Sequence, residues 1–276
     1  MAALLAVASS LMWGTADFLG GFTSRRLPVL AVYGLSQAVG CVVLVLAAFV
    51  TGAWADDPGY WPWALASSGL GLVAMLAFYT ALSTGPMGIV SPLVSVSVLV
   101  PLAFALLRGE SPTGTQVLGI VAAVVGILLA SGPELSGAES ARPLMFAGLA
   151  AICFGGMYLT LAEGSRYSPL MTATGMRITT VAVFVGILAV TRSIGGARRT
   201  DALPLAATGI LDAGANLTYG IATTLGLLST TAVLGSLYPV VTAVLAAIFL
   251  HERLRAVQYV GVAATIAGVV MISASG

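Results

Sequence analysis

Three charged residues, Asp17, Arg177 and Asp212, lie inside long apolar stretches of this 276-residue sequence. A charged side chain at the centre of a membrane helix costs about 2.5–3.5 kcal/mol on insertion scales. Three unpaired charges would cost on the order of 10 kcal/mol, so each needs a partner or contact with water. A guanidinium such as Arg177 can bind a carboxylate, and a carboxylate such as Asp212 can bind an amine or carry a proton.

Helical spacing gives each of these charges polar or aromatic neighbours. Side chains three, four or seven residues apart lie on one face of a helix. The shared faces are Trp13 with Asp17, Arg177 with Thr180, Tyr33 with Gln37 and Gly40, and Asp212 with Asn216, Tyr219 and Thr223. The last set predicts a continuous polar stripe along one helix.

The composition indicates which elements hold these residues. The chain is 59% apolar and only 8% charged, with a net charge of +1 and a mean hydropathy of +1.05. Soluble domains carry about 25% charged residues, so this composition excludes an ordinary soluble protein, a disordered chain and a nucleic-acid binder. A chain that crosses the lipid bilayer many times remains.

Charges and turn residues divide the chain into ten apolar runs. A spanning helix takes about 20 residues, and the runs lie near 2–22, 29–51, 62–82, 88–107, 114–131, 143–162, 169–191, 203–226, 230–250 and 255–273. Transmembrane strands would alternate with a period of two, which these runs do not. We predict an all-α integral membrane protein of ten transmembrane helices. The first run lacks a basic segment before it, so we expect a span and not a cleaved signal peptide.

The two halves of the sequence resemble each other. An offset of 142 aligns Glu110, Gln116, Gly119, Gly126 and Ser131 with Glu252, Gln258, Gly261, Gly268 and Ser273. Nearer the start, an offset of 141 aligns Gly14, Ser24, Arg25 and Pro28 with Gly155, Ser165, Arg166 and Pro169. We predict a first five-helix repeat over 1–131, a connecting loop over 132–142 and a second repeat over 143–276.

Five helices is an odd number, so the second repeat must enter the membrane from the opposite side. Inverted repeats are typical of alternating-access transporters, in which the solute binds near the midplane between the repeats. The alternative is that the duplication only builds a symmetric scaffold. The glycines at 119, 126, 261 and 268 recur on one helix face in each repeat, and they predict close helix packing or, as an alternative, a dimer contact.

The intramembrane charges break this internal symmetry. Tyr158 stands where the first repeat has Asp17, and in the first repeat Gly71 and Ser36 match Asp212 and Arg177. An asymmetric solute would need such asymmetry, whereas a packing scaffold would not. We predict a solute site formed by seven residues: Asp212, Asn216, Tyr219, Arg177, Gln37, Trp13 and Tyr158.

Structural alternatives stay open for several of these residues. Arg177 could form an ion pair with Asp212 or Asp17 that only holds helices together. Asp17 lies beyond the middle of its span, where a coupling, gating or structural role is as plausible as solute contact. Pro239 interrupts the ninth span, as Pro92 and Pro101 interrupt the fourth, and each proline could be a hinge or a packing feature.

The sequence shows no catalytic signature. His251 is the only histidine, and no catalytic cluster, metal-ligand spacing or phosphate-binding loop appears. Cys41 and Cys153 lie in apolar runs, where we interpret them as packing residues. We therefore predict no metal, no cofactor and no enzyme activity. A membrane-embedded enzyme or a lipid flippase with an intramembrane acidic site is the alternative.

Several short motifs resemble the EamA-type transporters of the drug/metabolite transporter superfamily. They are Trp13-Gly14, Tyr238-Pro239, Leu107-Arg108-Gly109-Glu110 followed by Gln116 and Gly119, and Leu250-His251-Glu252-Arg253-Leu254 followed by Gln258 and Gly261. Two departures are Ser97, aligned with Pro239, and Ser111-Pro112, where the family has arginine and leucine. The resemblance implies ten helices in two repeats and transport of small organic solutes, often amino acids or drugs and often outward.

The chain has no nucleotide-binding motif, so energy would come from the solute gradient or from protons. We expect a monomer or homodimer in a bacterial-type inner membrane. Loops on the side of the termini hold two arginines and the other loops hold eight, which places the termini outside by the positive-inside rule. The resemblance implies cytoplasmic termini instead.

Overall fold

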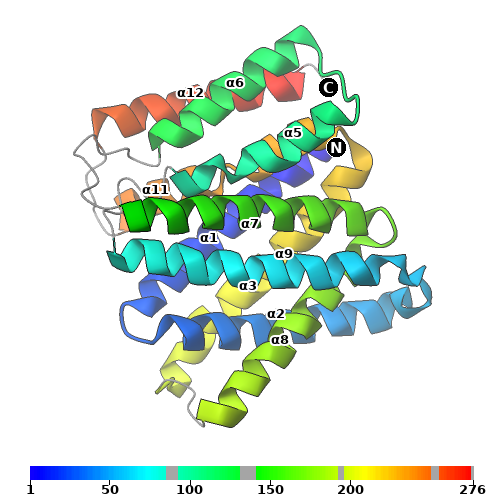
Figure 1. Cartoon of the computed structure of the whole chain (residues 1–276), viewed down its shortest axis with the longest axis vertical. Helices are drawn as coiled ribbons and strands as arrows, with labels where there is room; N and C mark the ends of the chain where they lie inside the picture. The colour runs from blue at the N-terminus through cyan, green and yellow to red at the C-terminus, as the bar shows by residue number, and fades with distance from the viewer. Residues whose placement is uncertain (85–92, 131–140, 192–195, 250–254, 275–276) are drawn as a thin grey trace.

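The computed structural model of the chain describes residues 1–84, 93–130, 141–191, 196–249 and 255–274. These residues form helices and no strand (Figure 1). The α-helices are α1 (Ala2–Ser24), α2 (Val29–Thr51), α3 (Trp61–Thr84), α5 (Leu99–Leu107), α6 (Gly114–Ala130), α7 (Ala141–Ser165), α8 (Pro169–Thr191), α9 (Ala202–Leu225), α10 (Leu228–Gly235), α11 (Tyr238–Phe249) and α12 (Ala256–Ala274). Four 3₁₀ turns are η1 (Ala53–Ala55), η2 (Pro58–Tyr60), η3 (Val96–Val98) and η4 (Arg199–Asp201).

The described helices account for ten membrane crossings. Seven segments are long and apolar enough to span a bilayer, and Leu93–Leu107 and Gly114–Ala130 are shorter apolar helices. The remaining crossing is α9, which carries the predicted polar stripe. The expected all-α architecture of ten transmembrane helices is confirmed.

The ninth crossing differs from the single predicted helix over 230–250. It consists of α10 and α11, and the chain leaves the helical hydrogen-bonding pattern between Gly235 and Tyr238. Pro239 lies in the first turn of α11, where a missing backbone N–H does not break the helix. Pro101 likewise lies in the first turn of α5. Pro92 and His251 lie outside the described residues.

Contacts of two glycines reproduce the internal repeat in space. A Cβ added to either glycine would lie 2.5–2.7 Å from a backbone oxygen and a valine side chain of another helix. These contacts join Gly14 to Tyr238 and Val241, and Gly155 to Ser97 and Val100. Each pair of equivalent residues is 141 apart. The alignment of Ser97 with Pro239 is therefore wrong by one position, and Ser97 corresponds to Tyr238.

The offset between equivalent residues changes before the last helix of each repeat. In α6, Gln116 accepts a hydrogen bond from the backbone N–H of Thr113 at 2.8 Å. In α12, Gln258 accepts one from the backbone N–H of Arg255, also at 2.8 Å. Equivalent residues here are 142 apart, so the one-residue difference lies between Val100 and Thr113. The repeated glutamines thus have a structural role, because each caps the first turn of the last helix of its repeat.

The repeated glycines pack α6 against α12, and the two helices lie side by side in Figure 1. A Cβ on Gly119 would lie 3.0 Å from the carbonyl oxygen of Gly268. A Cβ on Gly126 would lie 2.8 Å from the carbonyl oxygen of Gly261. Only glycine allows the two backbones to approach so closely. The four glycines therefore form a helix contact within the chain, as their spacing predicted.

Candidate functional site

A charged and polar cluster joins three helices in the middle of the bundle. Arg177 of α8 forms an ion pair with Asp212 of α9, with 2.9 Å between Nη2 and Oδ2. Gln37 of α2 bridges the pair, because its Nε2 donates to Oδ2 of Asp212 at 2.8 Å and its Oε1 accepts from Nη1 of Arg177. Of the two predicted ion-pair partners of Arg177, the structure thus shows Asp212.

Burial of the pair is uneven. The side chain of Arg177 is 2% exposed, whereas that of Asp212 is 23% exposed. Asn216, one helical turn along α9, donates from Nδ2 to the carbonyl oxygen of Asp212 at 2.6 Å and to its Oδ1 at 3.3 Å. The cluster therefore presents a partly accessible carboxylate in front of a buried guanidinium.

Several buried polar atoms of this region have no hydrogen-bond partner within the described part of the chain. They are Nε of Arg177, Oδ1 of Asn216 and the hydroxyl of Tyr219. An unsatisfied buried polar group costs about 1–3 kcal/mol. Donors and acceptors left open beside an ion pair are what a site for a polar solute provides, since the solute would satisfy them on binding.

Four aromatic rings from four helices form a layer beside this cluster. The ring centroids of Trp13 on α1 and Tyr158 on α7 lie 5.3 Å apart, and those of Trp13 and Tyr219 on α9 lie 5.4 Å apart. Tyr238 at the start of α11 lies 6.3 Å from Trp13. We call these four residues the aromatic layer. Such contacts between rings are favourable at these distances, and cations also bind to the faces of such rings.

Asp17 lies one turn along α1 from Trp13 and is exposed. It is close enough to Asp212, Tyr158 and Tyr238 to interact with each electrostatically. It therefore belongs to the same region as the cluster and the aromatic layer, although the described ion pair of Arg177 is with Asp212.

The structure thus brings the nine predicted residues into one region. Arg177, Asp212, Gln37 and Asn216 form the polar cluster, and Trp13, Tyr158 and Tyr219 contribute to the aromatic layer. Asp17 adjoins both groups, and Pro239 follows a residue of the aromatic layer. The sequence argument missed Tyr238 as a site residue, because its only signal was the Tyr-Pro motif and no helical spacing connects it to the other rings.

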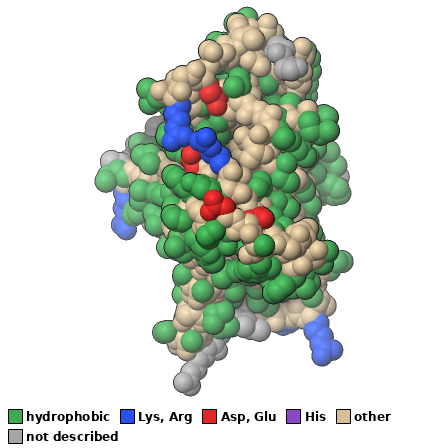
Figure 2. Space-filling model, turned by 90° about the vertical axis from the view of Figure 1, so that its right-hand side faces the viewer, with side chains coloured by type: hydrophobic (Ala, Val, Ile, Leu, Met, Phe, Trp, Pro, Cys, Tyr) green, Lys and Arg blue, Asp and Glu red, His purple; other side chains and the backbone are tan. Residues whose placement is uncertain are grey.

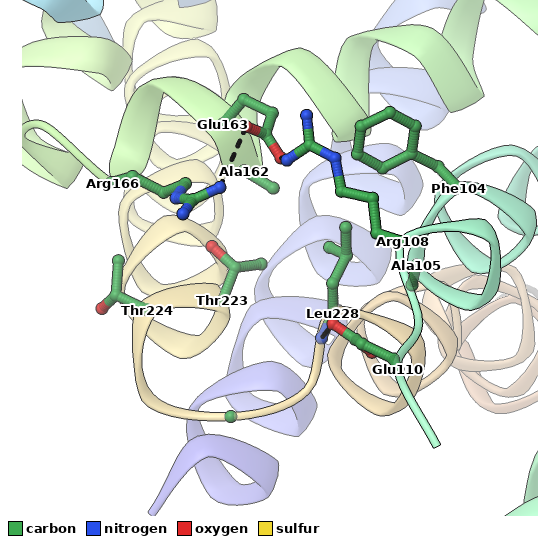
Figure 3. Close-up of a pocket in the computed structure, with 11 residues that line it drawn as sticks. Phe104, Ala105, Arg108, Glu110, Ala162, Glu163, Arg166, Thr223, Thr224 and Leu228 are labelled. Carbon is green, nitrogen blue, oxygen red and sulfur yellow. Dashed lines mark hydrogen bonds and ion pairs between the residues drawn. The ribbon is translucent and has the colours of Figure 1, made fainter. Parts of the chain in front are cut away.

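A second feature was not predicted, a pocket of about 460 Å³ at the end of the bundle that carries the N-terminus (Figure 3). Gly226 in its wall contacts Ala2. Figure 2 shows basic and acidic side chains gathered together on this face. The lining residues are Phe104, Ala105, Arg108, Glu110, Ala162, Glu163, Arg166, Thr223, Thr224, Gly226 and Leu228. Thr223, predicted to continue the polar stripe, lies here and not in the central cluster.

Ion pairs and backbone bonds cross this pocket. Glu163 of α7 pairs with Arg108 at 2.8 Å and with Arg166 at 3.4 Å. Glu110 accepts hydrogen bonds from the backbone N–H groups of Leu228 and Ser229 at 2.8 and 2.9 Å, and from the Ser229 hydroxyl at 2.8 Å. Within the described ranges, no three metal-ligating side chains gather anywhere.

Comparison with solved structures finds a protein with the same fold as this chain. A crystal structure described only as that of a protein aligns with a TM-score of 0.82 over 99% of this chain and 96% of its own. The two sequences are 18% identical, so this similarity concerns the fold alone. No curated protein matches the chain in sequence.

Comparison with family models matches both halves of the chain to one family. The EamA-like transporter family matches twice, over residues 1–132 and 142–274, once for each half of the chain. Together these matches cover nearly the whole sequence, and they agree with the internal repeat seen in the glycine contacts. The chain is a multi-pass membrane protein that belongs to the EamA-like transporter family of the drug/metabolite transporter superfamily.

Proposed function

We propose that the protein is a secondary transporter that exports small organic metabolites, such as amino acids or drugs, across the inner cell membrane. The observation that carries this proposal is the central site, in which a partly accessible carboxylate, a buried guanidinium and four aromatic rings lie between two inverted repeats. Sites at such repeat interfaces are where alternating-access transporters bind their solutes.

The chemistry of the site favours a solute with charged and apolar parts. Asp212 offers an accessible carboxylate to an amine, and the free Nε of Arg177 offers a donor to a carboxylate. The aromatic layer offers ring faces to an apolar group or to a cation. On binding, the polar groups of the site would exchange their hydrogen bonds with water for hydrogen bonds with the solute.

Asp17 and Pro239 would serve coupling and gating. Asp17 is exposed and lies in the same region as Asp212, and intramembrane carboxylates form the proton relays of many pumps and transporters. This arrangement suits coupling to protons. Pro239 follows the break between α10 and α11, where the ninth crossing can bend without loss of helical hydrogen bonds.

The test is solute movement in proteoliposomes. A thermal-shift screen against amino acids, amines, nucleosides and sugars first identifies a binder, since a ligand of the folded state raises its melting temperature. The labelled binder should then cross the membrane chemically unchanged. Asp212→Asn should abolish this movement, whereas Asp56→Asn, which removes an exposed carboxylate outside the site, should not. Conversion of the solute would indicate an enzyme, and movement of lipid alone would indicate a flippase.

A further inference from the structure

The turn after α5 connects two helices across the pocket at the terminal end of the bundle. Arg108 reaches Glu163 on α7, and two residues later Glu110 binds the first backbone N–H groups of α10 (Figure 3). We call Arg108, Glu110, Glu163 and Arg166 the clasp. Glu110 also places a negative charge at the positive end of α10, where it is favourable. The clasp therefore ties the first repeat to two helices of the second.

The geometry of the turn depends on Gly109. Its φ of +90° lies in the region that favours glycine. The N–H of Gly109 bonds to the carbonyl of Leu106 at 3.0 Å, and the N–H of Glu110 bonds to the carbonyl of Ala105 at 3.1 Å. These two bonds form a Schellman motif that ends α5. The motif fixes the direction in which the chain leaves the helix, and so it positions both charged side chains of the turn.

The floor of the pocket packs against the aromatic layer. Ala162 and Leu228 line the pocket, and both pack in one apolar cluster with Trp13, Tyr158 and Tyr219. Ala162 lies one helical turn from Tyr158 on α7. The clasp and the aromatic layer therefore contact the same apolar cluster.

The stripe on α9 connects the two regions along a single helix face. Thr223 lines the pocket, Tyr219 belongs to the aromatic layer, and Asn216 and Asp212 belong to the polar cluster. Thr223 lies eleven residues after Asp212 on α9, a distance of about 16 Å along the helix axis at 1.5 Å per residue. The pocket and the central site thus occupy successive levels of one polar path from the membrane interior to the terminal face.

We infer that the clasp is the gate of the transport path at the terminal end, and that Glu163 holds it closed by pairing with Arg108 and Arg166. This inference rests on the proposed transport function. Solute that leaves or enters through the pocket must separate α7 from the turn that carries Arg108, because their ion pair crosses it.

The strength of these contacts suits a gate that opens in every cycle. The side chains of Arg108 and Arg166 are 51% and 65% exposed, although that of Glu163 is only 10% exposed. Solvent therefore reaches the guanidinium end of both pairs and weakens them. The central Arg177–Asp212 pair differs, since its guanidinium is almost fully buried. The three bonds of Glu110 to α10 form a firmer connection, so opening would move α10 and the turn together, away from α7.

The test measures how often the pocket floor becomes accessible. A single cysteine is placed at Ala162, which is 5% exposed, after Cys41 and Cys153 are replaced by alanine. The purified protein in nanodiscs, where both faces meet solvent, is labelled with a charged maleimide. Loss of the two solvent-screened ion pairs of Glu163 in Glu163→Gln should raise the labelling rate roughly fivefold. Asp56→Asn is the matched control, since it also removes one carboxylate and lies outside the pocket.

A second variant separates opening from a direct charge effect on the new thiol. Glu163→Gln removes a negative charge near the thiol and would favour its thiolate, whereas Arg108→Gln removes a positive charge and would disfavour it. Opening predicts that both variants label faster. Rates that change in opposite directions, or that match the control in both, overturn the inference. If Arg108→Gln lowers the melting temperature, Arg166→Gln replaces it with the same prediction.

Labelling does not require transport, so the two hypotheses can fail separately. Faster labelling in both variants, with no solute moved by the wild type, would support the clasp as a closure and contradict the proposed transport. Solute transport by the wild type, with unchanged labelling in both variants, would overturn the gate and leave the transporter intact.

Discussion

Substitution of Asp212 by asparagine removes the only carboxylate that pairs with Arg177 among the described residues. Oδ2 of Asp212 lies 2.9 Å from the guanidinium and 2.8 Å from Nε2 of Gln37. In Asp212→Asn, Arg177 keeps only neutral acceptors, the amide oxygens of Gln37 and of the new asparagine. Because the side chain of Arg177 is 2% exposed, little water reaches the guanidinium to compensate for the lost carboxylate. Removal of one partner from a buried pair costs about 3–5 kcal/mol.

This loss should appear as a lower melting temperature. At about 2–4 °C per kcal/mol for a chain near this size, the expected decrease is about 6–20 °C. The double variant Asp212→Asn with Arg177→Gln should recover most of it, because no charge is then left alone. Both variants should transport poorly, since the solute loses the accessible carboxylate.

The assay combines thermal unfolding in detergent with transport by proteoliposomes that contain equal amounts of folded protein. A single variant with an unchanged melting temperature would refute the argument that Arg177 depends on Asp212. A double variant that is stable and transports at the wild-type rate would remove the ion pair from the solute site.

Three further predictions concern the scaffold and its orientation. Gly261→Ala should lower stability by about 1–3 kcal/mol, because its Cβ would lie 2.2 Å from the backbone nitrogen of Ala130. In the control Gly148→Ala the new Cβ meets nothing within 4 Å. Equal melting temperatures of the two variants would contradict this packing argument. Gly109→Ala should lower stability by about 1–2 kcal/mol, because alanine disfavours the positive φ at this position. It should also speed labelling of the cysteine at Ala162. A wild-type melting temperature together with a wild-type labelling rate would contradict the role of the Schellman turn. A cysteine added after Gly276 should react with an impermeant reagent in intact cells. The loops on the side of the membrane opposite the termini hold eight arginines, which places that side in the cytoplasm. Protection of the cysteine would place the termini inside.

Much of the architecture could be predicted because membranes restrict what a sequence can do. A bilayer requires apolar runs of about 20 residues, so the crossings could be recognised from length and hydropathy alone. The same apolar surroundings make an isolated charge costly, which is why Arg177 and Asp212 could be expected to find partners. The repeated glycines indicated a close contact, because small residues are what neighbouring backbones need in lipid.

The remaining features depend on how helices are rotated and how deep they lie, which spacing within one helix does not encode. Gln37 could be placed on a polar face of α2, yet its bridge between Arg177 and Asp212 requires α2, α8 and α9 to meet at one level. Tyr238 joins the aromatic layer because the ninth crossing restarts at that residue after a break. The clasp involves three separate stretches of chain, so Glu163 could only be read as part of a loop.

The contact between α6 and α12 has the geometry of a homodimer interface enclosed in one chain. Gly119 meets Gly268, and their repeat equivalents Gly261 and Gly126 meet each other, so the same patch is used twice about a pseudo-two-fold axis. An isologous contact of this kind needs no difference between its two partners. A five-helix unit that carries this patch can therefore pair with an inverted copy of itself. Within one chain the two halves are free to differ, and Arg177 and Asp212 occur in one half alone.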